Sequence, residues 1–183
     1  MANVRGRALD GALDFVRESW GEAGLQGVMA ELPPATRAVC NGLGEGHEWY
    51  PLEHLVVLLQ TARTSCAPED PSFFRRQGFY AGRREKAAYL GVMVATPEVI
   101  VKTAPTIWRM FYDVGRLVPV GNGVGQIQDF PTTPELCQRF VGIWDGIVGT
   151  PERPIVTTET RCRLRGDPFC ELTMTTPDGR PLV

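Results

Sequence analysis

Three thiols and one carboxylate in the C-terminal part of the chain could together hold a metal ion. Cys137, Cys162 and Cys170 are three of the five cysteines in the 183 residues, and Glu159 precedes Cys162 by three positions. Three thiolates and one carboxylate form a donor set that suits tetrahedral Zn²⁺. The alternative interpretation is that the cysteines are buried as small hydrophobic side chains. The residue types alone leave both interpretations open.

The hairpin expected around these cysteines decides whether they can meet. Two β-rich runs, 155–164 and 169–175, flank a turn-forming segment and predict an antiparallel pair. Because side chains alternate between the faces of a strand, a loop of four residues places Cys162 and Cys170 on opposite faces. A loop of three or five residues places them on one face. Glu159 has the wrong parity to share a face with Cys162, so it requires a bulge or a strand end to reach the same ion.

A second candidate site is a set of large aromatic side chains on two predicted helices. Trp108, Phe111 and Tyr112 occupy one broad face of the first helix. Phe140 and Trp144 belong to the apolar stripe of the second. Both helices should face the sheet. Core packing is the default role of such rings, and lining a small-molecule pocket is the functional alternative.

Catalytic motifs find no support in the sequence. The chain contains neither a Gly-x-Ser-x-Gly nucleophile elbow nor a phosphate-binding loop, and Gly121-x-Gly123-x-Gly125 is spaced as a hairpin turn. The two histidines, His47 and His54, are expected in a solvated loop and at a helix boundary. We therefore expect no enzyme and no catalytic residue.

Composition excludes several classes of protein. The formal net charge is −2, so no global basic field favours nucleic acid as a partner, and the basic run from Arg75 to Lys86 is expected to be a solvated helical face. No apolar stretch reaches the length of about 18 residues that a membrane span requires, and the N-terminus lacks the apolar segment of a signal peptide. An odd number of cysteines argues against a disulfide scaffold, so we expect a cytoplasmic chain with reduced thiols.

The predicted elements place helices before the sheet. Helical periodicity appears in four segments before residue 97, beginning near residues 9, 25, 51 and 72, although Gly78 and Gly82 weaken the fourth prediction. Pro97 and Pro105 are expected to delimit a further pair of helices.

After Gly115 the pattern changes to short strands. They flank an Asn122-Gly123 turn, and Thr132 with Glu135 has the spacing of a capping box at the start of one inserted helix. With the C-terminal hairpin, this order predicts an α+β fold in which N-terminal helices pack on an antiparallel sheet. The length fits one domain over residues 1–183.

The C-terminal segment resembles the end of the V4R (4-vinyl-reductase-like) domain. Residues 137–172 contain Cys-x6-Trp-Asp-Gly, then Glu-Thr-Arg-Cys, then Arg-Gly-Asp-Pro-Phe-Cys-Glu-Leu. The V4R family has a helical Cys, a Trp-x-Gly, a Glu-x-x-Cys and a Gly-Asp-x-x-Cys in the same order. Upstream, the segments 4–13 and 49–53 also resemble V4R-like relatives, including a family of uncharacterised myxobacterial proteins.

This resemblance implies a fold and a ligand set. V4R, haem-nitric-oxide-binding and Bet3-type domains have one α+β fold in common. That fold has a closed apolar pocket between its helices and its sheet. Zinc-bearing V4R members hold the metal with one Glu and three Cys, which implies that Cys137, Glu159, Cys162 and Cys170 hold a structural Zn²⁺ here. The haem-binding relatives use a histidine on a mid-chain helix and a Tyr-x-Ser-x-Arg motif. Residues 72–117 contain neither, so the expectation is that no haem is bound.

The resemblance also implies a function. We expect a sensor-type signalling domain that binds a hydrophobic small molecule, aromatic or acyl, among the five aromatic side chains and acts through an unknown protein partner. V4R-like domains commonly pair through N-terminal helices, so a homodimer is expected. Its candidate surface is a stripe that could bury against a twin or against its own sheet: Leu9, Leu13, Val16 and Trp20. Two alternatives stay open, a tethering subunit with a permanent lipid and an accessory protein in tetrapyrrole reduction.

Overall fold

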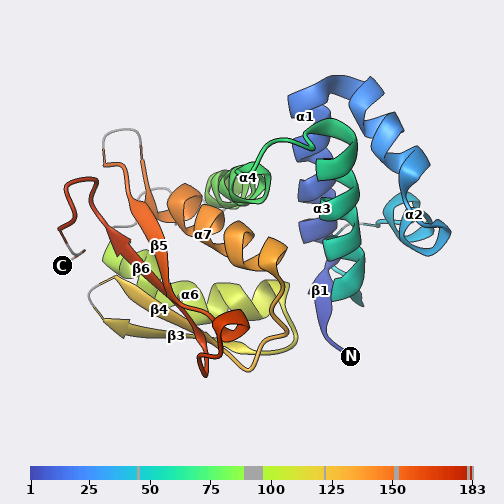
Figure 1. The fold of residues 1–183 in the computed structure, drawn as a ribbon. Helices are drawn as coiled ribbons and strands as arrows, with labels where there is room; N and C mark the ends of the chain where they lie inside the picture. Colours follow the sequence, from blue (N-terminus) through green and yellow to red (C-terminus); the bar gives the residue numbers. More distant parts are fainter. Residues whose placement is uncertain (45, 89–96, 122, 151–152, 181, 183) are drawn as a thin grey trace.

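Helices fill the first part of the chain and a four-stranded sheet fills the last third (Figure 1). The computed structural model describes residues 1–183 except 45, 89–96, 122, 151–152, 181 and 183. The described helices are α1 (Gly6–Glu31), α2 (Pro34–Asn41), α3 (Leu52–Cys66), α4 (Phe73–Ala88), α6 (Pro97–Phe111) and α7 (Pro134–Val148). The described strands are β1 (Asn3–Arg5), β2 (Trp49–Pro51), β3 (Arg116–Gly121), β4 (Val124–Gln128), β5 (Val156–Arg161) and β6 (Cys170–Thr175). The predicted α+β class is confirmed.

One antiparallel sheet, in the order β3-β4-β6-β5, carries the C-terminal half of the core. Ile127, Leu172 and Met174 alternate on its buried face, whereas Gln126 and Glu171 point to the other, part-exposed face. Helices α6 and α7 lie along the buried face, as Figure 1 shows. The sheet therefore presses these two helices, which carry the predicted aromatic site, against the N-terminal helices.

The N-terminal helix stripe lies inside the chain's own core. Gly21 adopts a φ of 71°, and it divides α1 into the two helical segments that the periodicity predicted. Leu9 and Val16 are fully buried, and Leu13 is nearly so, because α1 packs against α3 and α4. The prediction that this stripe is a dimer surface is therefore wrong for Leu9, Leu13 and Val16, because the chain itself covers them, whereas its fourth member, Trp20, is half-buried. The helices, rather than the sheet, cover them.

Helices α4 and α7 cross in unusually close contact. A Cβ added at Gly78 would lie 2.0 Å from the carbonyl oxygen of Arg139, and one added at Gly82 would lie 2.4 Å from the carbonyl oxygen of Ile143. A Cβ added at Gly142 would lie 1.9 Å from the carbonyl oxygen of Arg75. The glycines that weakened the helix prediction for 73–88 are thus required for close approach of two backbones.

Two boundary predictions differ from the structure. Pro105 lies inside α6 instead of separating two helices. Its ring removes one backbone hydrogen bond, but Ile100, Ala104 and Trp108 form a continuous buried face that holds the helix together. The N-cap of α7 is Thr133, whose side chain accepts a hydrogen bond from the Leu136 amide, and not Thr132. Asn122 of the predicted turn lies outside the described residues.

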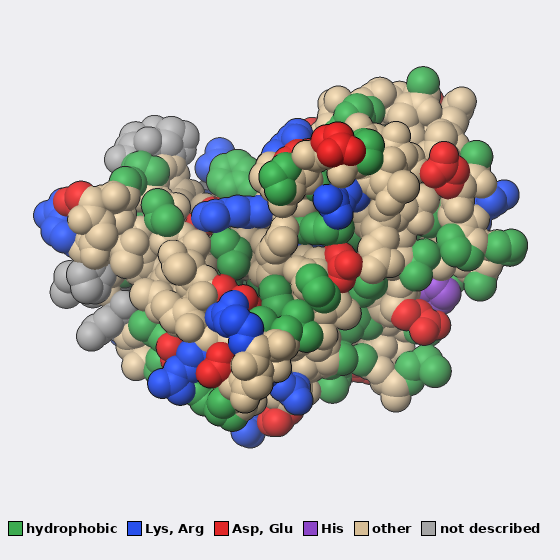
Figure 2. Space-filling model, in the orientation of Figure 1, with side chains coloured by type: hydrophobic (Ala, Val, Ile, Leu, Met, Phe, Trp, Pro, Cys, Tyr) green, Lys and Arg blue, Asp and Glu red, His purple; other side chains and the backbone are tan. Residues whose placement is uncertain are grey.

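The basic run on α4 is solvent-exposed at Arg75, Arg76 and Arg83, as predicted, and several of its arginines are also paired. Arg75 lies 2.7 Å from Asp145 of α7, and Arg84 lies 2.6 Å from Asp10 of α1. Figure 2 shows acidic and basic side chains interspersed over one face of the molecule. The run therefore joins helices to one another. Among the described helices, none is both long and apolar enough to cross a membrane.

Candidate metal centre and ligand cavity

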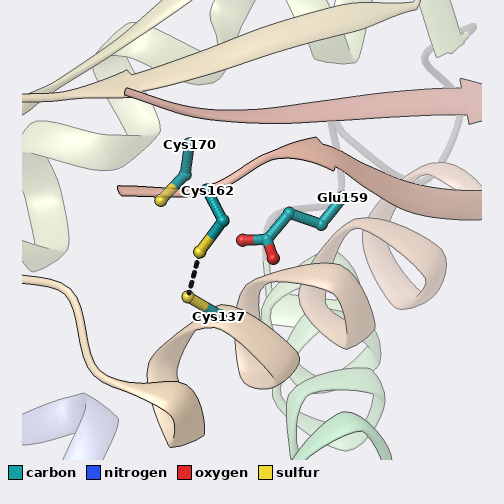
Figure 3. A group of neighbouring side chains, drawn as sticks. All are labelled: Cys137, Glu159, Cys162 and Cys170. Carbon is teal, nitrogen blue, oxygen red and sulfur yellow. Dashed lines mark hydrogen bonds between the residues drawn. The ribbon is translucent and has the colours of Figure 1, made fainter. Parts of the chain in front are cut away.

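The four predicted metal donors meet at one point between α7 and the C-terminal hairpin. One thiol or carboxylate atom from each of Cys137, Glu159, Cys162 and Cys170 lies within 4.8 Å of all the others (Figure 3). The sulfurs of Cys137 and Cys162 are 3.6 Å apart, and both thiols are free. Two thiolates bound to tetrahedral Zn²⁺ at about 2.3 Å are about 3.8 Å apart, so this spacing fits the metal.

A bulge in β5 brings the carboxylate to the thiols. Glu159 pairs with Leu172 of β6, but Arg161 pairs with Glu171, so one extra residue is inserted between the two pairs. This insertion reverses the alternation of side chains along the strand. Glu159 and Cys162, which an uninterrupted strand would point to opposite faces, can therefore face α7 together.

The surroundings of the cluster leave one acceptor unused. Glu159 lies 3.2 Å from Arg165 through Oε2, while its Oε1 is buried without a hydrogen-bond partner. Figure 3 shows this carboxylate pointing toward the sulfur of Cys162. The backbone amide of Arg163 donates to the Cys170 sulfur at 3.5 Å, a contact that suits a thiolate. An orphaned carboxylate oxygen beside three sulfurs fits a bound cation.

Electrostatics within the cluster favour a cation. Burial, reinforced by the Glu159 carboxylate, raises the pKa of the Cys137 thiol well above its ordinary value. Burial also raises the pKa of Cys162. These thiols stay protonated at neutral pH when no cation is near, and a divalent metal supplies the opposite charge that allows them to ionise.

An apolar cavity of about 90 Å³ lies between α1, α4, α6, α7 and β3. Its walls include all five aromatic residues that the sequence singled out: Trp108, Phe111, Tyr112, Phe140 and Trp144. The lining also includes small residues of α1 and α4, namely Ala8, Gly11, Ala81 and Gly82. The cavity is therefore shared between the N-terminal helices and the helices that cover the sheet.

The polar tips of the aromatic residues already have partners. The Trp108 indole N–H donates to the Val114 carbonyl at 3.2 Å, and the Tyr112 hydroxyl accepts from Arg139 at 3.0 Å. The Trp108 ring also packs 5.3 Å from that of Phe140. Trp108 therefore serves the core as well as the cavity wall.

Sequence reasoning missed the most deeply buried charged residue of this cavity. Arg139 lines it and is 3% exposed. It lies three positions after Leu136 and four before Ile143, so helical spacing placed it on the apolar face of α7. A charged residue in an apolar stripe was the signal available.

Neither histidine contributes to the cavity. His54, on α3, is hydrogen-bonded to the Thr36 hydroxyl at 3.0 Å, and His47 lies exposed in the loop after α2. The described cavity wall therefore offers no histidine as a ligand for a haem iron.

Comparisons with known proteins identify the fold. No protein-family model and no curated protein sequence matches the chain. An H-NOX protein from Shewanella oneidensis in the Fe(II)NO ligation state is 12% identical, with a TM-score of 0.69 over 94% of this chain and 98% of that one. An oxygen-binding H-NOX domain related to soluble guanylate cyclases is 11% identical, with a TM-score of 0.66 over 98% of this chain and 97% of that one. The chain therefore has the H-NOX fold, in agreement with the fold that the C-terminal resemblance implied.

These comparisons correct one expectation. A further neighbour, from work on heme distortion in the H-NOX family, is 11% identical with a TM-score of 0.63, over 92% of this chain and 91% of that one. The expectation that no haem is bound is contradicted, because the fold is the one found in these heme-binding domains. That expectation rested on motifs missing from 72–117, and the similarity at 9–14% identity is visible only in three dimensions.

Proposed function

We propose that the chain is a sensor-type domain that binds a small hydrophobic molecule in the cavity between its helices and does not transform it. The observation that carries this proposal is the apolar cavity lined by the five predicted aromatic residues. Aromatic and aliphatic walls with few polar groups are typical of small-molecule sites. None of these five side chains is a nucleophile or a strong base near neutral pH, which supports binding without turnover.

Binding would act through the arrangement of the helices. Ala8 and Ala81 line the cavity from α1 and α4, whereas Trp108 and Phe140 line it from α6 and α7. A ligand that contacts both pairs of helices stabilises the arrangement in which they close around it. In this proposal the chain belongs to the V4R family and passes the signal to a regulatory protein partner in the cytoplasm.

Thermal unfolding with a cavity-filling variant tests the proposal. Toluene is expected to raise the melting temperature of the purified protein, because a ligand of the native state stabilises it by mass action. Ala104→Leu enlarges a buried wall residue of α6 and should abolish this rise, whereas Thr106→Leu, at an exposed position of α6, should keep it. A toluene effect that is absent, or equal in both variants, would contradict the proposal.

The same purified sample answers the haem question. Its visible absorption spectrum reports a bound haem, and native mass spectrometry reports an acyl chain that co-purifies. A titratable cavity supports sensing, whereas a permanently bound lipid would support the tethering alternative instead.

We also propose that Cys137, Glu159, Cys162 and Cys170 hold one structural Zn²⁺. The support is the convergence of four donor atoms within 4.8 Å, together with the unpartnered Glu159 Oε1. Four protein ligands leave no open position, so the ion would clip α7 to the β5–β6 hairpin rather than act on a substrate. Elemental analysis of protein purified without chelator should give about one zinc per chain. A zinc-free sample with all three thiols freely titratable would rule the site out.

A further inference from the structure

A buried cation without a carboxylate partner lies in the cavity wall. The Arg139 Nε donates to Gln77 Oε1 at 2.7 Å, and Nη1 donates to the Tyr112 hydroxyl at 3.0 Å. Both acceptors are neutral. None of the ion pairs among the described residues includes Arg139. A guanidinium removed from water without a counter-charge is unfavourable, so this position calls for an anion.

The other two cationic side chains of the cavity wall, Arg7 and Arg84, already have carboxylate partners. Arg7 lies 2.8 Å from Glu85, and Arg84 lies 2.6 Å from Asp10 and 3.0 Å from Asp14. Arg139 differs because it is held against α4, where its carbonyl oxygen lies 2.0 Å from the position that a Cβ of Gly78 would take. Its side chain is buried beside neutral partners, so no acidic side chain among the described residues pairs with it.

The hydrogen-bonding capacity left on the two partners of Arg139 consists of donors. The fully buried Gln77 has its Oε1 engaged by Arg139, while its Nε2 has no partner. The Tyr112 oxygen accepts from Arg139, and none of the described residues accepts a hydrogen bond from its own O–H. Unused donors around a cation are satisfied by an acceptor that carries negative charge.

We propose that the cavity binds a small organic carboxylate, with the carboxylate at Arg139 and Tyr112 and the apolar body against Trp108 and Phe140, all four of which line it. This inference rests on the proposed function and adds the chemical class of its ligand. An inorganic anion would leave the apolar wall without contacts. A volume of about 90 Å³ limits the body to a single ring or a short acyl chain.

Calorimetric titration with three probes at neutral pH tests this inference. Benzoate carries ring and charge, benzyl alcohol carries a ring of similar size without charge, and acetate carries the charge without a ring. Benzoate is expected to bind at least about tenfold more tightly than either of the others, as a charge-assisted hydrogen bond and apolar burial both contribute. Benzoate binding no tighter than benzyl alcohol, or no tighter than acetate, would overturn the inference.

Variants then locate the charge. Arg139→Met should lower benzoate affinity at least about tenfold and leave benzyl alcohol affinity unchanged. The melting temperature of the empty protein measures separately the loss of the hydrogen bonds from Arg139 to Gln77 and Tyr112. Arg76→Met, a change on the exposed face of α4 where Arg76 pairs with Asp70, should leave both affinities unchanged. If toluene and benzyl alcohol bind without any preference for benzoate, the carboxylate inference fails and the proposed function stands. If no apolar probe binds, the proposed function fails as well.

Discussion

The convergence of the four candidate metal donors depends on a single inserted residue. Thr160 separates the pair Glu159–Leu172 from the pair Arg161–Glu171, and without it Glu159 would point away from the thiols. Cys162 follows directly after β5 and Cys170 begins β6, so the two thiols stand on either side of the turn. Strand β5 therefore places Glu159 near the thiols, and the bulge at Thr160 turns its side chain toward them.

Replacing one thiol tests whether this position binds metal. Cys137→Ser should lower zinc affinity by at least about 100-fold, because it removes a direct ligand, and even outer partners of a metal site contribute 10–100-fold. Cys40 is the matched control, since Cys40 and Cys137 are both 8% exposed and both free. Cys40→Ser should therefore keep about one zinc per chain by elemental analysis. Equal zinc content in both variants would show that Cys137 is an ordinary buried thiol.

The control residue has a pH dependence of its own. Burial raises the pKa of the Cys40 thiol from 9.0 to about 11. When the pH lies between 9.0 and about 11, the Cys40 thiol is mostly deprotonated in the unfolded chain but still protonated in the folded protein. The contribution of Cys40 to stability is therefore complete below pH 9 and is lost as pH rises toward 11, at up to about 1.4 kcal/mol per pH unit.

Urea unfolding on either side of the ordinary thiol pKa measures this effect. The free energy of unfolding of the natural protein should fall between about pH 8 and about pH 10, and Cys40→Val should lose less over the same interval. The same slope in both proteins would assign the decline to other groups.

Single residues also mark the limit of what the sequence could predict at the candidate sites. Cysteine and glutamate types indicated the four donors, and helical spacing indicated all five aromatic wall residues. The parity of Glu159 and Cys162 along the strand indicated that a bulge or a strand end was needed, but it did not place the bulge at Thr160. The pairing of Arg139 with Gln77 joins two helices far apart in the chain, so no local pattern could reveal it. The expectation that no haem is bound failed for a similar reason. It used motifs missing from one segment, whereas the likeness to heme-binding domains lies in the whole fold.

At the level of elements, the crossing of α4 and α7 positions both sites. Arg139 of the cavity and Cys137 of the metal cluster lie on α7, and α4 fixes that helix through Gly78, Gly142 and the Arg75–Asp145 ion pair. Backbone-to-backbone contact leaves no room for a side chain between the helices. The two sites therefore share one rigid support.

Adding one methyl group at this crossing should be strongly destabilising. The new Cβ of Gly142→Ala would lie 1.9 Å from the Arg75 carbonyl oxygen, so the helices must move apart, at a cost of at least about 2 kcal/mol. Gly27→Ala on α1 is the matched control, because a Cβ there has nothing within 4 Å and should stabilise the helix by about 0.5–1 kcal/mol. Chemical denaturation of both variants measures the difference, and a neutral Gly142→Ala would mean that the crossing is loose.

The elements were more predictable than their ends. Apolar periodicity located α1, α3, α4, α6 and α7, and the strand pattern located both hairpins, since burial of one face determines each period. The short helix α2 and the three-residue strands β1 and β2 were not predicted. Pro105 and Thr132 were misinterpreted because local signals for helix ends are weaker than the packing of a buried face. Gly78 and Gly82 show the same principle, since the packing partner and not the local propensity explains them.

At the scale of the whole molecule, a homodimer stays a prediction, but its interface must differ from the N-terminal stripe. Leu9, Leu13 and Val16 are covered by the chain itself, so any pairing must use other residues. Leu9→Ala should then reduce the melting temperature through a core cavity, by an amount equivalent to about 2–5 kcal/mol, at any protein concentration. Analytical ultracentrifugation should give the same association state for this variant as for the natural protein. A dimer that dissociates in the variant while the fold persists would restore the stripe as an interface.

The cavity joins the two halves of the molecule, and a ligand in it should stabilise both. Helices α1 and α4 form one side of the wall, and α6 and α7, which lie on the sheet, form the other. Any opening that separates the halves destroys the cavity, so a bound ligand raises the free energy of every such opening. With saturating toluene, hydrogen–deuterium exchange should therefore slow around Ala8 and Ala81 as well as around Trp108 and Phe140. Helix α2 contributes nothing to the wall and should exchange at an unchanged rate. Slowing confined to α6 and α7 would mean that the ligand contacts only the sheet side, and that the helices cannot transmit its presence in the way we propose.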